Sequence, residues 1–453
     1  MQTPPDRVDR DVVHLVFRAP LIAALAISGS AFAADAAPAA QTPGITYVVS
    51  ADAISAGDTA WLLTSAVLVM LMTLPGLAFF YGGLVRKRNI IGTMTQIFGT
   101  ACAVSVLWFA VGYSIAFSHG SSWLGGLSKM AGGQFGGVLQ GVGVDSLAPH
   151  VPETVFALFQ CGFAIVTCAL IVGAFAERVK FSVAVIFCSL WLVLVYAPVA
   201  HWVWHPEGWA YLMGVRDFAG GIVVHVNAGA AALACALAVG PRKGFGSEPL
   251  TPANLAYMLI GAGLLWIGWF GFNGGSALGA NAQAGLASVN TLVSAALAAL
   301  VFISLEWVMG GKPTLVGIST GAVAGLVAIT PAAGFVTLDS SAWFGLAGGV
   351  VSFIGLHWLK PWLNIDDSLD VFAIHGLVGI AGSVMTPLFS RRELTGVDSA
   401  LGAEMGVTAG VFVYSFVASW LIMKLLDAVM KARVSPAEEA LGLDRSQHGE
   451  RIE

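Results

Sequence analysis

The sequence predicts an all-α polytopic membrane protein with eleven transmembrane helices, built as a 5+5 inverted repeat plus one extra helix. Composition is the first reason: 57% of the 453 residues are hydrophobic and only 10% are charged, whereas soluble domains carry roughly 25% charged residues. The second is a mean hydropathy of +0.82, concentrated in long apolar runs. The third is the alternation of positive charge in the connections between these runs. The net charge of -5 offers no basic surface, so nucleic acid is excluded as a partner.

Each expected helix is an apolar run close to the length of about 20 residues that a bilayer requires. The run at 313–330 is the shortest and is rich in glycine. The eleven runs are 59–85, 90–118, 153–176, 181–201, 218–240, 252–273, 286–305, 313–330, 340–359, 370–390 and 403–426.

Lysine and arginine in the connections predict the direction of the helices. They follow odd-numbered runs, as in RKRN (86–89), ERVK (177–180) and PRKG (241–244), and Lys431 follows the last run. Connections after even-numbered runs carry few positive charges. We therefore expect the odd connections and the C-terminus in the cytoplasm and the mature N-terminus outside.

The ends of the chain are expected to have their own roles. Residues 1–33 combine early arginines with an apolar run and an A-F-A cleavage pattern, which predicts a signal peptide. Residues 34–58 then form an extracytoplasmic lead, 59–430 the eleven-helix domain, and 431–453 a cytoplasmic tail. A cleaved signal peptide agrees with an N-terminus outside the membrane.

Two histidines occupy equivalent places in the expected repeat. His225 lies in the fifth run and His375 in the tenth, and no other ionisable residue lies so far inside a run. At about 1.5 Å per residue, both fall near the membrane centre, where ionisable groups usually mark a transport or proton path. Asp217 and Asp370 open these two stretches, and we expect both to be N-caps, with Asp217 also helping to hold a cation outside.

The histidine pair favours a small molecule that both donates and accepts hydrogen bonds, because neutral imidazole does both. A bare cation would find nothing to replace its hydration shell. A zinc site is the competing use of two histidines, but no cysteine, third histidine or carboxylate has a suitable spacing. No metal and no cofactor are expected.

Aromatic residues cluster at the expected outer ends of three runs. These stretches are FALFQCGFA (156–164), HWVWHPEGW (201–209) and WIGWFGFNGGSALGA (266–280). Aromatic faces attract cations without removing all of their water, but a plain interfacial belt has the same composition. Both interpretations stay open on composition alone.

Several motifs occur in order between about residue 57 and residue 449. They are PGLAFFYGGLVRKRN (75–89), FQCGFA (159–164), IVGAFAERVKFS (171–182), DFAGGIVVHVNAG (217–229), GWFGFNGGSA (268–277), DDSLDVFAIHGLVGI (366–380) and RVSPAEEALGLDRSQHGE (433–450). By these motifs and their spacing, the sequence resembles ammonium transporters of the Amt/Mep/Rh family, in the bacterial Amt branch.

The resemblance implies roles for individual residues. The paired pore histidines of the family fall on His225 and His375, and its stacked pore phenylalanines fall on Phe163 and Phe272. The external cation site falls on Trp204 and Ser276, with Phe163 as a third wall. A structural aspartate falls on Asp217. It also implies that NH4+ is recruited outside and deprotonated, and that NH3 then crosses an apolar pore while the proton travels separately. Such transport is electrogenic and rejects K+, which has no proton to lose.

The resemblance further implies a homotrimer in the bacterial inner membrane, and a PII-type nitrogen-signalling protein that docks on the tail. Two departures from the family pattern are the ending HGERIE and Gly274, where alanine is frequent. Two other functions stay open: an Rh-like facilitator of neutral NH3 or CO2, and an ammonium sensor that signals through the tail. No nucleophile and base are placed together at membrane depth, so an enzyme is not expected.

Overall fold

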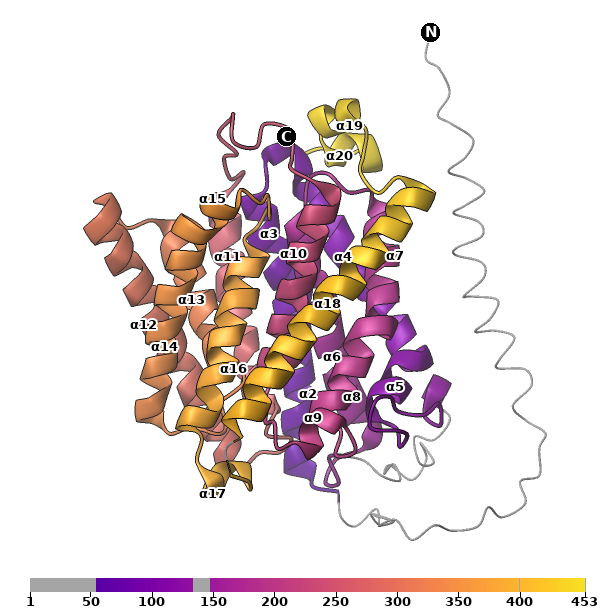
Figure 1. The fold of residues 1–453 in the computed structure, drawn as a ribbon, viewed down its shortest axis with the longest axis vertical. Coiled ribbons are helices and arrows are strands. Elements are labelled where there is room, and N and C mark those ends of the chain that lie inside the picture. The colour runs from indigo at the N-terminus through magenta and orange to yellow at the C-terminus, as the bar shows by residue number, and fades with distance from the viewer. Residues whose placement is uncertain (1–53, 133–146, 399, 453) are drawn as a thin grey trace, which may run out of the picture. The chain divides into compact units, whose positions relative to one another are not determined.

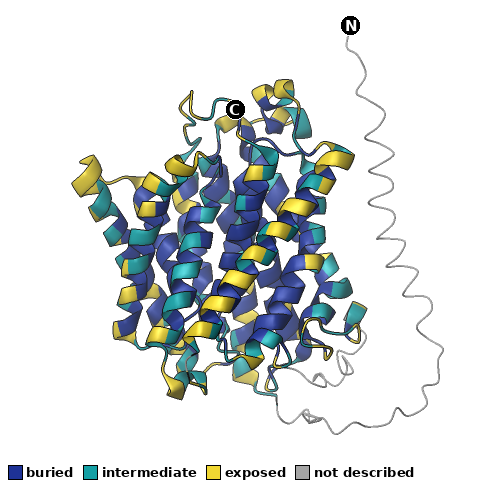
Figure 2. Ribbon diagram, viewed as in Figure 1, coloured by how far each residue is buried: buried dark blue, intermediate teal, exposed yellow. Residues whose placement is uncertain are grey.

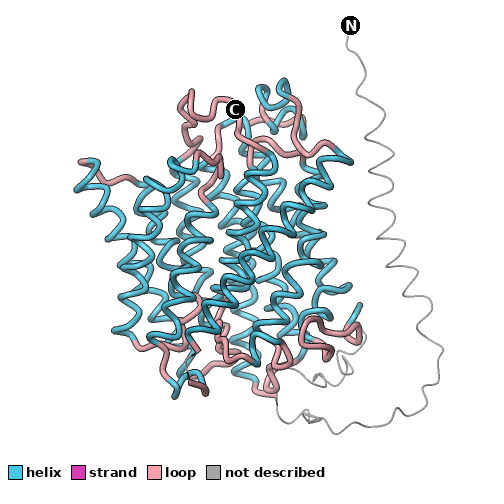
Figure 3. The backbone as a smooth tube through the Cα atoms, viewed as in Figure 1, coloured by secondary structure: helices cyan, strands magenta, loops and turns pink. Residues whose placement is uncertain are grey.

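The computed structural model describes residues 54–132, 147–398 and 400–452 (Figure 1). The expected signal peptide at 1–33 and most of the lead at 34–58 lie outside the described residues. In the described ranges the chain is helical, without a named strand, and only two isolated β-bridges occur (Figure 3). The all-α prediction is confirmed.

Ten helical stretches of the described chain are long and apolar enough to cross a membrane. They are Ala56–Leu84 (α2 to α3), Lys87–Phe117 (α4 to α5), Glu153–Phe175 (with α6, Glu153–Val172), Phe181–Leu212 (α7 to α9), Gly221–Val239 (with α10), Leu255–Gly274 (with α11), Ala282–Gly310 (α12), Leu338–Leu363 (α14 to α15), Phe372–Phe389 (with α16) and Leu401–Met430 (α18). A shorter apolar helix, α13 (Leu315–Ile329), matches the shortest predicted run. Its 15 residues rise only about 22 Å, so the count of eleven spans and their orientation stay predictions.

Burial follows the apolar pattern of each helix. Helix α6 is apolar on all sides, and nearly all of its residues are buried at the centre of the bundle. Helix α18 crosses the outside of the bundle obliquely and buries only a stripe, leaving apolar side chains such as Val413 and Val429 60% and 73% exposed (Figures 1 and 2). Exposed apolar residues of this kind suit a surrounding lipid phase.

Short π-helical segments interrupt several of the long helices. Two of them carry the predicted histidines: η8 (Gly221–Val226), which leads into α10 (Asn227–Val239), and η11 (Phe372–Leu377), which leads into α16 (Val378–Phe389). A π-helical turn leaves backbone groups in altered register and recurs at functional sites. The two histidine-bearing helices therefore share a local distortion.

Glycine allows these two helices to pack backbone against backbone. A Cβ atom on Gly229 would lie 2.3 Å from the Cα and N atoms of Gly376, and one on Gly379 would lie 3.0 Å from the Cβ of His225. Small residues at such crossings are typical of helices that associate in lipid. This contact sets how closely His225 and His375 approach.

The C-terminal residues fold back onto one end of the bundle. Helix α19 (Pro436–Leu441) starts with a capping box, and α20 (Leu443–His448) follows it. The Leu443 N–H donates to Asn89 Oδ1 and the Gly92 N–H donates to Asp444 Oδ1, both at 2.8 Å. The tail is thus fixed to the start of α4 (Ile90–Leu107).

Candidate functional site

The two predicted histidines meet in the interior of the bundle. Their Nδ1 atoms lie 3.2 Å apart, and their rings lie 5.2 Å apart at an angle of 25°. His225 is 1% exposed and His375 is 4% exposed. A bond between two Nδ1 atoms requires one ring to donate and the other to accept, and His225 Nε2 has no partner among the described residues. The pair therefore presents an unused polar nitrogen in otherwise apolar surroundings.

A small chamber of about 10 Å³ lies beside this pair. That is about the space of one water molecule. Trp269, which the sequence analysis did not single out, stacks on His225 with ring centres 5.5 Å apart and an angle of 19°. The chamber is lined by Met72, Leu77, Phe80, Tyr81, Val166, Leu170, Val224, His225, Leu265, Trp269, Phe272, Val323 and His375. Apart from the two imidazoles and the Tyr81 hydroxyl, this lining is apolar.

Phe163 and Phe272 separate the chamber from a second, larger cavity. Their rings stack 4.2 Å apart at an angle of 22°, and both side chains are fully buried. Phe272 lines the chamber and Phe163 lines the larger cavity. The stacked pair is therefore the wall between the two compartments.

The larger cavity has a volume of about 210 Å³ and combines aromatic faces with a hydroxyl group. The rings of Trp204 and Phe163 are nearly perpendicular, with ring centres 5.8 Å apart and an angle of 87° between the planes. Ser276 donates its hydroxyl hydrogen to the carbonyl oxygen of Phe272 at 2.8 Å, which leaves the hydroxyl oxygen able to accept a hydrogen bond. Gln160 and Tyr211 also line this cavity, and the sequence analysis missed both. The arrangement can hold a small cation that carries N–H groups: the aromatic rings attract the positive charge, and the Ser276 oxygen accepts a hydrogen bond from an N–H.

Asp217 caps the start of η8 with both carboxylate oxygens. They accept four backbone N–H groups at 2.6–3.1 Å, those of Gly220, Gly221, Ile222 and Val223. Burial raises the pKa of the Asp217 carboxyl above its usual value, although the four donors act in the opposite direction. The Trp204 indole N–H donates to the Asp217 backbone oxygen at 2.9 Å. The cap therefore also fixes one wall of the larger cavity, and these contacts are those of the helix cap that the sequence predicts for Asp217.

The same capping role predicted for Asp370 is wrong. Asp370 has a φ of 61°, turns the chain into η11, and directs its carboxylate to Lys360 in α15 (Lys360–Leu363). The cap is Asp367, whose Oδ2 accepts the Phe372 N–H at 2.7 Å. Asp367 precedes His375 by the same eight residues that separate Asp217 from His225. The equal spacing was the signal in the sequence that could have identified it.

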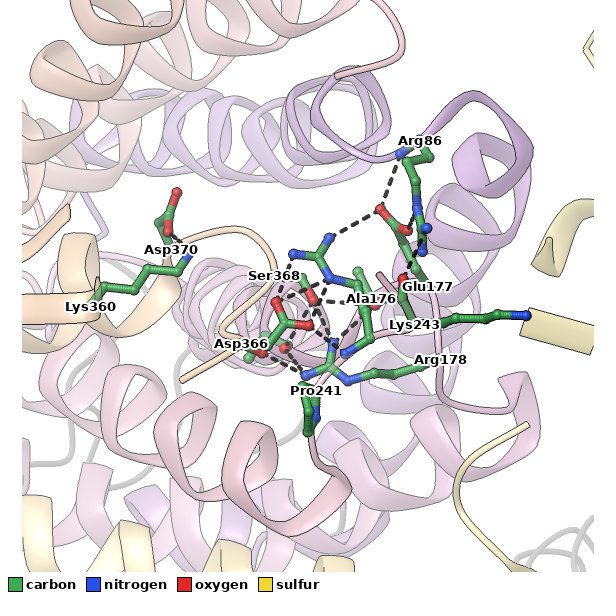
Figure 4. A network of polar contacts seen from close by, with 12 residues as sticks. Arg86, Ala176, Glu177, Arg178, Pro241, Lys243, Lys360, Asp366, Ser368 and Asp370 are labelled. Atoms are coloured by element: carbon green, nitrogen blue, oxygen red, sulfur yellow. Dashed lines mark hydrogen bonds and ion pairs between the residues drawn. The ribbon is translucent and has the colours of Figure 1, made fainter. Parts of the chain in front are cut away.

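A network of charged side chains joins the loops at the end of the bundle where the tail docks (Figure 4). Arg242 lies 2.7 Å from Asp366 and 3.2 Å from Glu177, which also pairs with Arg86. Burial acts to raise the pKa of Asp366, but the hydrogen bonds and charge of Arg242, together with the charge of Arg178, hold it below its usual value. This network fixes the loop that leads into the His375 helix. In the described chain no three histidine, cysteine, aspartate or glutamate side chains gather as a metal site.

These features define the protein first as a class: a multi-pass helical membrane protein built around a narrow apolar passage with a polar pair inside it. A model of the Ammonium Transporter Family matches residues 60–452, and the chain belongs to that family.

Similar proteins include a putative ammonium transporter of Methanothermobacter thermautotrophicus, 46% identical over 88% of this chain and 98% of its own length. An ammonium transporter of Bacillus subtilis is 42% identical over 87% and 98%. Among solved structures, Candida albicans Mep2 superposes with a TM-score of 0.78 at 32% identity, covering 85% of this chain and 88% of its own. A Sensor Amt Protein superposes with a TM-score of 0.79 at 28% identity, covering 86% and 98%.

Proposed function

We propose that this protein moves ammonium across the bacterial cytoplasmic membrane, by recruiting NH4+ and conducting NH3. The observation that carries the proposal is the order of the compartments. A cavity suited to a small cation comes first, then a wall of two stacked phenylalanines, then a chamber for one small molecule beside the histidine pair. Family membership supports the choice of ammonium as the substrate.

Recruitment takes place in the larger cavity. The faces of Trp204 and Phe163 stabilise the positive charge, and the Ser276 oxygen accepts an N–H hydrogen. Because the aromatic groups are not ionised, they hold the cation loosely enough to release it. The cation gives its proton to water in the larger cavity before the phenylalanine wall: an N–H bond breaks, water takes the proton, and NH3 remains. The chamber beyond has no carboxylate in its lining to compensate a charge. K+ has no proton to lose and stops at this point.

Conduction past the histidines then involves a neutral molecule. NH3 donates and accepts hydrogen bonds, so it can exchange partners with His225 Nε2 and with the pair as a whole. The bond between the two Nδ1 atoms also offers a route for the separated proton, which makes net transport electrogenic. Trp269 holds the His225 ring in place by stacking on it.

The remaining parts of the proposal concern assembly and control. We infer that the chain forms a homotrimer, with the mature N-terminus outside and the tail in the cytoplasm, where a PII-type protein docks. The packing of α19 and α20 onto the loops that carry most of the positive charge supports a cytoplasmic tail.

An ammonium sensor is the second candidate, favoured by the similarity to the Sensor Amt Protein. A sensor would bind ammonium while carrying little current, whereas an Rh-like facilitator would move NH3 or CO2 with no current at all.

Ammonium-evoked current in proteoliposomes tests these alternatives. The wild type should carry a saturable current that K+ does not evoke, and His225→Ala and His375→Ala should each lose coupling or selectivity. His357→Ala is the matched control. His357 lies in η10 (Gly355–Leu359), which continues α14 (Leu338–Ile354), and it lines neither of the two compartments. Full, selective, coupled transport in both pore variants would contradict the histidine mechanism, and transport without current would favour the neutral facilitator.

A further inference from the structure

The loop at 364–371 brings three carboxylates to the start of the His375 helix, and only two of them have a cationic partner. Asp366 pairs with Arg242, and Asp370 pairs with Lys360. Asp367 has no ion pair within 4 Å in the described chain, and its side chain is only 3% exposed. Its Oδ2 accepts the Phe372 N–H, while its Oδ1 has no hydrogen-bond partner. A buried, unpartnered carboxylate oxygen is costly unless it carries a proton or receives a ligand.

Comparison with Asp217 shows how unusual this is. Both aspartates precede a pore histidine by eight residues and both cap its helix. Asp217, however, has both oxygens occupied by four N–H groups, so it has no free acceptor position. Asp367 keeps one oxygen free. The two caps therefore differ in the one property that proton exchange requires.

Asp367 lies at the opposite end of the passage from Trp204. The helix of His225 starts beside Trp204 and Asp217 and ends at Gly240, whose carbonyl oxygen accepts from Arg178 Nε at 2.8 Å. The same arginine donates to the carbonyl oxygen of Asp366 at 2.7 Å. A molecule that enters at Trp204 and passes the histidines thus leaves towards Asp367.

The groups that face Asp367 come from four parts of the chain. Lys360 comes from α15 and Asp370 from the same loop, Arg178 follows α6, and Tyr81, which lines the chamber, belongs to α3 (Ala78–Leu84). Burial raises the pKa of Asp367 to about 6; the charge of Lys360 opposes this rise and that of Asp370 adds to it. A carboxyl in this range can both release and regain a proton near neutral pH.

We propose that Asp367 is a proton-exchange residue at the inner end, which gives its proton to NH3 as the molecule leaves the chamber. The inference rests on the proposed function. The O–H bond of the carboxyl breaks, the ammonia lone pair forms the fourth N–H bond, and NH4+ leaves into the inner solution. Ammonia is the stronger base, so the transfer is downhill. The remaining carboxylate is held by the Phe372 N–H and the nearby Lys360 charge until it takes up a proton, either from inner water or from the proton released at recruitment.

Asp367→Asn separates proton exchange from capping. The asparagine oxygen still accepts the Phe372 N–H and fills the same volume, but it cannot release a proton. We expect ammonium-evoked current in proteoliposomes to fall about tenfold, at the lower limit of general acid catalysis. The dependence of wild-type current on inner pH near 6 should disappear, and half-saturation by external ammonium should not change. Asp367→Glu should restore part of the pH dependence, and the exposed Asp398→Asn should behave as wild type.

A second measurement does not depend on transport. Infrared difference spectra between pH 5 and pH 7 should contain the carbonyl stretch of a protonated carboxyl group that Asp367→Asn lacks. Absence of that band from the wild type, or wild-type current and pH dependence in Asp367→Asn, would overturn the proposal and leave the ammonium function standing. Unchanged transport in the His225 and His375 variants would instead contradict the proposed function, while the infrared band would still report the proton on Asp367.

Discussion

Substitution of Gly229 by alanine should separate the two pore histidines. The added Cβ would lie 2.3 Å from backbone atoms of Gly376, whereas ordinary contacts of a Cβ begin at 3.4 Å. To lengthen this contact from 2.3 Å to 3.4 Å, the two helices must move apart by about 1.1 Å. Backbone atoms cannot swing away as the end of a side chain can, so the shift reaches the neighbouring turn that carries His225.

The consequence for the pair can be estimated directly. A separation of 3.2 Å between the Nδ1 atoms, increased by that shift, becomes about 4.3 Å, which is too long for a hydrogen bond. Overpacking of this kind costs about 1–3 kcal/mol of folding free energy. A displacement of about 1 Å at a functional centre can reduce a rate about a hundredfold. We therefore expect ammonium-evoked current to fall by that order and the unfolding temperature in detergent to drop.

Gly410→Ala is the matched control for this substitution. Gly410 is also a glycine within a long helix, α18, but beyond its own stretch of helix no atom of the described residues lies within 4 Å of the position of its Cβ. Higher helix propensity should leave it equally or more stable, by up to about 1 kcal/mol, with unchanged current. Wild-type current and unfolding temperature in Gly229→Ala would refute the conclusion that this contact sets the histidine geometry.

Three further predictions follow from the site. Phe272→Ala removes one half of the stacked wall, so we expect the free energy of unfolding to fall by about 3–5 kcal/mol. The variant should also carry a K+ current in the absence of ammonium, measured as ion flux. A variant that still excludes K+ would mean that Phe163 closes the passage alone. Arg242→Gln leaves Asp366 buried without its cation, so stability should fall by about 3–5 kcal/mol and the pKa of Asp366 should rise, as unfolding measured against pH would show. Burial raises the pKa of Asp367 to about 6 in the folded protein, above about 3.9 in the unfolded chain, so its contribution to folding stability is full at low pH. Up to about 3 kcal/mol of that stability should be lost as pH rises from about 4 to 6. Unfolding of Asp367→Asn, measured across this pH range, should lack the loss.

The membrane helices could be predicted from the sequence because lipid imposes a simple requirement of length and apolarity. Every expected run coincides with a helix, including the short one at α13. The π-helical segments at His225 and His375 could not be predicted in this way. Hydropathy reports where a helix lies but carries no information on the register of its hydrogen bonds.

The candidate site was predictable where a motif or a repeat places residues, and not where the chain folds loops together. The contact between His225 and His375, which lie 150 positions apart, agrees with the equivalent places they were given in the repeat. The pairing of Arg242 with Asp366 spans 124 positions between two loops without periodicity, so nothing in the sequence indicates it. Asp370 is the residue that opens the expected run at 370–390, whereas Asp367 lies in the loop before it. The left-handed turn at Asp370 moves the cap three residues earlier.

The chamber beside the histidines, with its volume of about 10 Å³, leaves no room for a second molecule. Channels that conduct rapidly usually hold several ions in a row, and each arrival expels the one ahead of it. A compartment with a single occupant has no such queue. Labelled ammonium should therefore cross independently in the two directions. The ratio of inward to outward flux should follow the ratio of the ammonium activities that drive them, to the first power. The maximal rate should be limited by the time that one molecule takes to leave the chamber.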